Sequence, residues 1–287
     1  MQAAQGIDLF SQVAGVGCSG GLTLVKGSLE LSGLFLVQQY LRILLQNGYA
    51  VILVTAEQSL ERYKYVTKKM GINLPSYQQS GHLICVEAPI ATPGDSGHGS
   101  LRHIFTAVQH AVRQRPVQAL GLAVLFDSLT VLASLCPSPE DWTGFLHYCC
   151  GTGGAFAASS QATTEEQQQQ QPAEQRPQVP YCVIAGVYDD VPDDRAWLTS
   201  LEHRADVVVS VEPLPGRIAD VDGVVTVTRR AVPQPAATPQ QLPAPSGQAT
   251  PSGGSAPGCA PLRQSLYFRA GELAIKWMQH VTARELL

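Results

Sequence analysis

Residues suited to nucleotide chemistry lie at three places in the sequence. A loop at residues 26–33, KGSLELSG, separates a strand-like apolar run from a strongly apolar helix-like run, and such a loop is the usual cradle for phosphate groups. Glu57 directly follows a second apolar run, and Asp127 ends a third. An acid at one such position can hold the Mg²⁺ of a nucleotide, and an acid after a neighbouring strand can activate water. The spacing therefore points first to phosphoryl transfer.

The loop nevertheless lacks the side chains of a working phosphate loop, whose pattern is G-x-x-x-x-G-K-[ST]. Ser28 replaces the first glycine, Gly33 keeps the second, and Leu34 and Phe35 replace the lysine and the hydroxyl residue. Leu34 and Phe35 cannot bind phosphate or Mg²⁺ and are expected to pack into the core, while Glu30 would repel phosphate. We predict a lost nucleotide site, with no catalytic residue, no nucleotide-binding residue and no cofactor. The expected remnants of that site are Ser28, Gly33, Glu57 and Asp127.

Two other patterns resemble ligand sites but lack the necessary context. Residues 15–20 match G-x-G-x-x-G, but no strand precedes them, so a flexible entry loop is favoured over dinucleotide binding. His147 lies close to Cys149 and Cys150, yet adjacent cysteines cannot easily present both sulfurs to one tetrahedral ion. We therefore predict no metal site.

The elements that would position these residues alternate between strands and helices. Early apolar runs are continuous rather than alternating, which is typical of parallel strands covered on both faces, and the last strands have no helices between them. We predict an α/β fold, a doubly wound and mostly parallel sheet with an antiparallel C-terminal extension. The expected strands are 22–26, 50–55, 82–87, 120–127, 181–187, 206–211, 224–229, 265–269 and 273–277. The expected helices are 34–46, 60–70, 101–113 and 142–149.

Two internal segments have the composition of flexible insertions. Residues 151–180 are rich in Gln, Ala, Gly and Glu, and residues 231–261 are dominated by Pro, Ala, Gln, Ser and Gly. Neither has the apolar periodicity that would offset the entropy of ordering. We therefore expect a flexible segment at 1–19 and a single domain at 20–287 that carries these two insertions.

Composition, net charge and cysteine pattern limit the classes of protein to which this chain can belong. The chain has 287 residues, 45% of them hydrophobic, and a net charge of −4, so any contact with nucleic acid needs a local basic surface. The seven cysteines include no C-x-x-C pattern, and no secretory signal or membrane-length apolar run is visible. A reduced compartment is expected, either the cytoplasm alone or the cytoplasm and also the nucleus.

The order of these segments resembles a known family. TAEQSLERYKYVTKKMGINL is similar to the corresponding segment of RecA, and AVLFDSLTVLASL is similar to its Walker B strand. More narrowly, residues 20–74, the stretch VLFDSLTVLASL with the later FLHYCC, and LRQSLYFRAGELAIKWM resemble the family of Elongator complex subunit six. These segments cover most of residues 20–150 and the C-terminal part of the chain.

The resemblance implies a RecA-like fold without a usable phosphate loop. It also implies a non-catalytic subunit that forms a hetero-hexameric ring with two related RecA-fold subunits and associates with the remaining Elongator subunits. Such a ring binds tRNA and supports modification of the wobble uridine. No membrane partner is implied, and the two long insertions depart from the compact pattern of the family.

Basic residues at two places are candidates for contact with tRNA. Arg62, Lys68 and Lys69 point away from the apolar face of the helix expected after Glu57, and Arg229 and Arg230 end a strand. Clustered cations of this kind suit phosphate contact, although ordinary solvated charge explains any single one of them. Two alternatives stay open: an atypical ATPase of the RecA or recombinase class that uses Glu57 and Asp127, and a scaffold that never touches RNA.

Overall fold

The computed structural model of the chain describes residues 9–13, 21–88, 98–136, 138–150, 181–214, 221–230, 262–271 and 275–279. The insertions predicted at 151–180 and 231–261 lie outside the described residues, as does the G-x-G-x-x-G pattern at 15–20. The expectations for these segments stay predictions.

A nine-stranded sheet in the order β3-β2-β4-β5-β1-β6-β7-β8-β9 forms the centre of the structure. The first six strands in this order run parallel, and β7, β8 and β9 continue the sheet in antiparallel fashion. The strands are β1 Gly21–Gly27, β2 Ala50–Thr55, β3 Leu83–Glu87, β4 Leu122–Phe126, β5 Tyr181–Tyr188, β6 Val207–Pro213, β7 Gly223–Arg229, β8 Leu262–Ala270 and β9 Ile275–Met278. The predicted sheet, mostly parallel with an antiparallel C-terminal extension, is confirmed.

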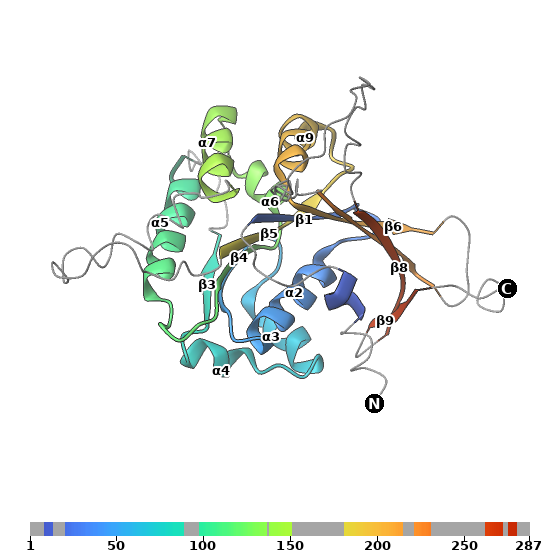
Figure 1. Cartoon of the computed structure of the whole chain (residues 1–287). Coiled ribbons are helices and arrows are strands. Elements are labelled where there is room, and N and C mark those ends of the chain that lie inside the picture. Colours follow the sequence, from blue (N-terminus) through green and yellow to red (C-terminus); the bar gives the residue numbers. More distant parts are fainter. Residues whose placement is uncertain are drawn as a thin grey trace, which may run out of the picture.

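Helices cover both faces of this sheet (Figure 1). One face carries α2 Leu34–Gln46, α3 Leu60–Lys69 and α4 Leu74–Gln79. The other carries α5 His98–Gln114, α6 Leu129–Ser134, α7 Pro139–Cys150 and α9 Arg195–Arg204, and a short 3-10 helix at Pro192–Asp194 precedes α9. Each face has its own apolar core cluster, so the parallel strands are buried on both sides. Every residue of β2 and β4 is buried, as their continuous apolar runs predict.

The two helices nearest the degenerate loop have clear start and stop signals. Asn47 follows α2 and Gly48 has a φ of 75°, a conformation that glycine adopts without steric cost. The hydroxyl of Ser59 caps α3 by accepting a hydrogen bond from the Arg62 backbone N–H. Lys68 and Lys69 lie in the last turn of α3, where the helix dipole favours positive charge.

Residues 9–13, inside the segment expected to be flexible, instead form a short helix. The cause is aromatic packing. The fully buried ring of Phe10 stacks on Trp277 at a centroid distance of 5.0 Å and meets Tyr40 edge-on at 5.3 Å. A hydrogen bond of 2.9 Å from the Arg229 guanidinium to the carbonyl oxygen of Val13 holds the end of this helix. The N-terminal helix therefore docks onto α2 and the antiparallel strands.

Candidate functional site

The degenerate loop between β1 and α2 is closed by its own hydrogen bonds. The backbone N–H of Ser28 donates to the carbonyl oxygen of Leu31 at 3.1 Å, and the N–H of Leu31 donates to the Ser28 hydroxyl at 3.0 Å. At the end of the loop, the N–H of Leu34 donates to the Ser32 hydroxyl at 3.2 Å. A phosphate loop works by pointing such N–H groups at the ligand. Here the N–H groups of Ser28, Leu31 and Leu34 donate to oxygen atoms of the loop and are therefore not available to a phosphate.

A carboxylate from outside the loop takes a further donor. The backbone N–H of Leu29 donates to Asp190 Oδ2 at 2.8 Å. The loop is also narrow where it begins and ends, because a Cβ atom on Gly27 would overlap with the backbone nitrogen of Gly33. An anionic side chain and a tight backbone therefore stand where phosphate would have to enter.

The two residues that replace the lysine and hydroxyl residue of a phosphate loop have structural roles. Leu34 and Phe35 are both partly buried and pack against the apolar core, as the sequence predicts. The Phe35 ring lies 5.0 Å from the ring of Phe268, centroid to centroid. These contacts tie the start of α2 to the antiparallel strands.

Asp127 connects two strand ends instead of facing a metal site. Its side chain is only 2% exposed. Oδ1 accepts a hydrogen bond from the N–H of Ala56 at 2.8 Å, Oδ2 accepts from Gln58 at 3.1 Å, and the N–H of Glu57 lies 3.3 and 3.2 Å from the two oxygens. The carboxylate at the end of β4 therefore holds the loop between β2 and α3 in place.

The pKa of Asp127 is raised to about 6 by burial, and the nearby Glu57 adds to the increase. The three backbone N–H donors act in the opposite direction because they favour the ionised carboxylate, but burial outweighs them. Asp127 is therefore the carboxyl group at this site whose protonation should influence stability near neutral pH.

Glu57 also has a partner within the protein. The phenol of Tyr188, the last residue of β5, donates to Glu57 Oε1 at 2.5 Å and lies 3.1 Å from the Ser32 hydroxyl. Burial and the bond to Glu57 raise the pKa of Tyr188 to about 12, so the phenol keeps its proton. Ser32, Tyr188 and Glu57 thus connect the degenerate loop to the ends of β5 and β2.

The lysine at the start of the loop is likewise engaged. Lys26 Nζ lies 2.5 Å from Glu202 Oε1 and 3.4 Å from Asp189 Oδ2. Burial alone would lower the pKa of Lys26, but these two carboxylates outweigh it and raise the pKa above its usual value. Its positive charge is thus already compensated by two acids.

Stability should report the raised pKa of Asp127. Because the folded-state pKa of about 6 exceeds the ordinary value of 3.8, the contribution of Asp127 is complete below about 4 and is lost as the pH rises through about 6. Relative to Asp127→Asn, wild type should lose roughly 2 to 3 kcal/mol of unfolding free energy across this range. Urea unfolding of both proteins at several pH values measures the difference. A wild-type advantage that grows with pH would mean that the three N–H donors dominate instead.

The candidate RNA contacts on α3 are exposed, and two of them flank an aromatic ring. Arg62, Lys68 and Lys69 are all exposed. The Arg62 Cζ atom lies 6.0 Å from the centroid of the Tyr65 ring, and Lys69 Nζ lies 4.7 Å from it. Arg62 and Lys69 also line a pocket, whereas Lys68 does not. The structure therefore separates Lys68 from the other two.

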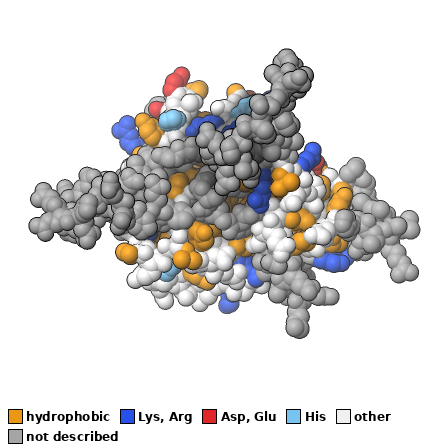
Figure 2. Space-filling view, in the orientation of Figure 1, with side chains coloured by type: hydrophobic (Ala, Val, Ile, Leu, Met, Phe, Trp, Pro, Cys, Tyr) orange, Lys and Arg blue, Asp and Glu red, His pale blue; other side chains and the backbone are white. Residues whose placement is uncertain are grey.

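Arg229 and Arg230 lie at the opposite edge of the parallel strands. Arg229 pairs with Val207 at the N-terminal end of β6, whereas α3 comes after the C-terminal end of β2, so the two basic groups lie toward opposite ends of the parallel strands. Arg229 is half-buried and committed to the N-terminal helix, while Arg230 is exposed. The structure does not bring the two predicted basic groups together. On the face drawn in Figure 2, the Lys and Arg side chains lie in several separate places.

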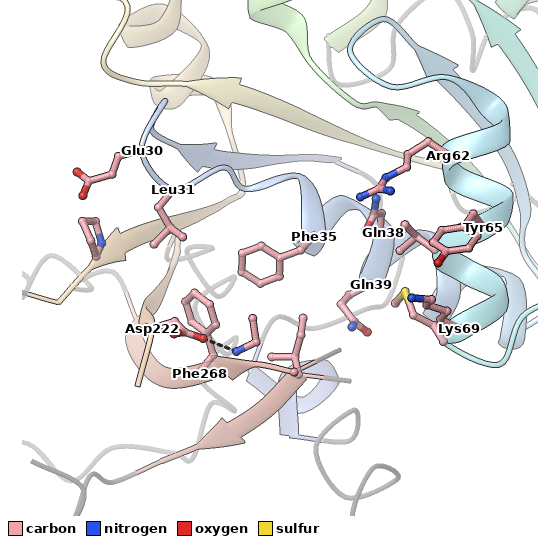
Figure 3. A pocket seen from close by; sticks show the side chains of 16 residues that line it. Glu30, Leu31, Phe35, Gln38, Gln39, Arg62, Tyr65, Lys69, Asp222 and Phe268 are labelled. Carbon is pink, nitrogen blue, oxygen red and sulfur yellow. Dashed lines mark hydrogen bonds between the residues drawn. The ribbon is translucent and has the colours of Figure 1, made fainter. Parts of the chain in front are cut away.

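A pocket of about 780 Å³ between α3 and the hairpin of β8 and β9 was not predicted from the sequence. Its floor is the start of α2, including Phe35, Gln38 and Gln39, and one wall is the face of α3 that carries Tyr65 (Figure 3). The available signal was the adjacent pair Gln38-Gln39 in a mostly apolar helix, whose other polar residues are Arg42 and Gln46.

The described residues contain no group of three or more His, Cys, Asp or Glu side chains placed to hold a metal ion. Cys149 and Cys150 are buried in the core between α7 and the sheet, and burial raises the pKa of both thiols. Among the helices described here, none has the length and apolar character needed to span a membrane.

Comparison with known proteins finds sequence relatives of this chain. No family model matches the chain. Over 233 residues it is 26% identical to Elongator complex protein 6 of Xenopus tropicalis, covering 74% of this chain and 80% of that protein. The protein of the same name from Xenopus laevis is 27% identical with the same coverage. The predicted resemblance to Elongator subunit six is confirmed.

Solved structures support the fold assignment. A KaiC-like protein from Pyrococcus horikoshii superimposes with a TM-score of 0.51 over 94% of both chains, at 12% identity. An uncharacterized protein from the same organism, solved in complex with an unknown peptide, gives a TM-score of 0.52 over 96% of this chain and 98% of that one, again at 12% identity. The RecA-like fold predicted from the sequence is thereby confirmed.

Proposed function

We propose that this chain is a non-catalytic, RecA-fold subunit of the Elongator complex. In this proposal it forms a hetero-hexameric ring with two related RecA-fold subunits, and the ring binds tRNA and supports modification of the wobble uridine. The similarity to Elongator complex protein 6 of two Xenopus species supports the assignment to that complex. Other Elongator subunits are then partners of this chain, and its place is the cytoplasm, with a fraction in the nucleus.

The closed loop is the observation that carries the non-catalytic assignment. Its N–H groups bond to Ser28, Leu31, Ser32 and Asp190, so phosphate would have to break existing bonds to enter. The alternative of an atypical ATPase requires Asp127 to face Mg²⁺, whereas both of its oxygens accept from the backbone of residues 56–58. These hydrogen bonds support a subunit whose RecA-like fold serves assembly and not ATP hydrolysis.

Assembly and tRNA binding rest on different features. A doubly wound sheet with a closed nucleotide loop can still present its edges and helices to related subunits, because packing does not require a bound nucleotide. Binding of tRNA needs cations within an acidic chain, and Arg62, Lys68, Lys69 and Arg230 are exposed and available for phosphate contact. Arg229 is the weakest of the proposed contacts because it already bonds to Val13.

Purification of the full chain from cells, with mass identification of the proteins that accompany it, tests the proposal. The expected result is stoichiometric recovery of two further RecA-fold subunits, in a particle whose mass fits two copies of each. Recovery of the chain alone, or with a nucleic-acid repair complex, would contradict it. Binding of labelled tRNA to the recovered particle then tests the RNA part separately, because a scaffold that never touches RNA would assemble without binding tRNA.

A further inference from the structure

Two largely buried glutamines line the pocket beside α3, and their carboxamides have no hydrogen-bond partner among the described residues. Gln38 and Gln39 are 8% and 5% exposed and both line the pocket. Within the described part of the chain, neither carboxamide makes a hydrogen bond, while other buried polar side chains such as Thr67 do. A glutamine amide offers two donors and an acceptor, which a ligand in the pocket can pair with. Two such groups facing one pocket indicate a ligand with both donors and acceptors.

The α3 wall of the same pocket combines an exposed ring with two positive charges. Tyr65 is 54% exposed, so its ring is accessible to a ligand in the pocket. Arg62 and Lys69 flank it, and among the described residues neither forms an ion pair, whereas Lys64 on the same helix is paired with Glu61 at 2.7 Å. Because both cations lie over the ring, a ligand with a flat face that stacks on Tyr65 would displace them toward its own negative charge.

The opposite side of the pocket is apolar and carries its acids at the edge. Phe35 and Phe268 face α3 across the opening (Figure 3). Asp222 already accepts a hydrogen bond from the N–H of Ala270 at 2.6 Å, and Glu30 lies at the far end from α3. A bound anion would therefore lie against the α3 wall, and an aromatic group would lie between the ring of Tyr65 and the ring of Phe35.

We propose that this pocket binds an unpaired nucleotide of RNA. The base stacks on Tyr65 and packs toward Phe35, the amides of Gln38 and Gln39 pair with its edge, and the adjoining phosphate lies against Arg62 and Lys69. This inference rests on the proposed function, since it supplies a contact site for the RNA of the ring. Amide side chains can present donors or acceptors to different base edges, so the pocket selects for an unstacked base and not for one sequence.

A peptide segment is the main competing occupant, because peptide groups also pair with amides. The nucleotide is favoured by two cations that lie over a single exposed ring and form no ion pair among the described residues. A stacked base with its phosphate needs this arrangement, while a peptide would need an acidic side chain beside each cation.

The test measures binding of a short single-stranded oligouridylate, and of an RNA duplex of equal length, to the full chain by fluorescence anisotropy. Tyr65→Ala should weaken single-strand binding about tenfold or more, because stacking of one base contributes that much. Gln39→Leu should also weaken it while keeping the shape of the floor. Lys69→Gln should lower the salt dependence by about 0.7 in log–log slope, as expected for one lost phosphate contact on a single strand.

Lys64→Gln is the matched control, because it removes one positive charge from the same helix at a residue that does not line the pocket and already pairs with Glu61. It should leave the affinity for the oligouridylate near the wild-type value. Equal losses for Lys64→Gln and Lys69→Gln, no effect of Tyr65→Ala, or tighter binding of the duplex than of the single strand would each overturn the proposal. Displacement of the RNA by micromolar AMP would also overturn it, since the pocket would then be a site for free nucleotides.

The same variants in the assembled ring separate this inference from the proposed function. If the wild-type ring binds tRNA but the pocket variants bind it equally well, the pocket proposal fails and the ring proposal stands. If the wild-type ring binds no tRNA while the full chain binds the oligouridylate through Tyr65, the ring proposal fails and the pocket stands. Pocket variants that prevent assembly without changing oligouridylate binding would identify a partner segment as the occupant, which also contradicts the inference.

Discussion

Gly186→Ala should lower the free energy of unfolding by about 3 kcal/mol, because overpacking against a fixed backbone costs this much. Gly186 lies in β5 opposite Val25 of β1. A Cβ atom at this position would overlap with the carbonyl oxygen of Asp127 and lie 3.4 Å from a methyl group of Val37. Relief requires movement of the chain at the end of β4, and with it the loop that Asp127 holds. Urea unfolding of the full chain measures the loss.

Gly144→Ala is the control for this substitution. Gly144 lies within α7, and a Cβ atom there would meet nothing within 4 Å. Alanine should therefore stabilise the chain by about 0.5 to 1 kcal/mol, since it lowers the entropy cost of forming a helix. Opposite signs for the two variants are expected. A Gly186→Ala protein as stable as wild type would show that β4 and β5 do not approach this closely.

Phe10→Ala should cost about 3 kcal/mol, the usual effect of removing a buried aromatic ring. The ring is fully buried between Trp277 and Tyr40, so its loss releases the N-terminal helix and exposes part of β9. At this chain size a change of 1 kcal/mol shifts the melting temperature by roughly 2 to 4 °C. The expected decrease is therefore on the order of 6 to 12 °C in a calorimetric scan.

Leu29→Ala provides the comparison for Phe10→Ala. Leu29 is 73% exposed, and substitution of such a surface side chain normally changes stability by less than about 0.5 kcal/mol. If Phe10→Ala behaved like Leu29→Ala, residues 9–13 would not be docked in solution. The sequence-based expectation of a flexible segment at 1–19 would then hold for residues 9–13.

Most of the sheet could be predicted because its strands are continuous apolar runs between glycine-containing or polar loops. Helix α2 has the bounds expected from its apolar residues and from Asn47-Gly48. The short elements α4, α6 and α9 were missed for a physical reason. Helix α4 buries only Leu74, and α6 buries only Leu129 and Leu132, so neither carries a repeating apolar face. Tertiary contacts determine such short helices.

The site shows a similar division between local and long-range information. The missing lysine and hydroxyl residue are visible in the loop itself, and Leu34 and Phe35 pack as expected. The bonds that engage Glu57 and Asp127 could not be inferred, because they join residues separated by 131 and by 69 to 71 positions. The pocket is lined by residues of α2, α3 and the hairpin of β8 and β9, and no pattern within one segment encodes that arrangement.

Titration of the full chain with Mg²⁺ and ATP, together with an assay of phosphate release, tests the central claim most directly. The claim is that a RecA-like fold persists here with its phosphate site closed by internal bonds. The predicted result is no micromolar binding and no phosphate release above that of buffer alone, in wild type and in Asp127→Ala alike. Micromolar affinity for ATP that Asp127→Ala abolishes would contradict the claim, because it would return Asp127 to the role of holding a nucleotide-bound Mg²⁺.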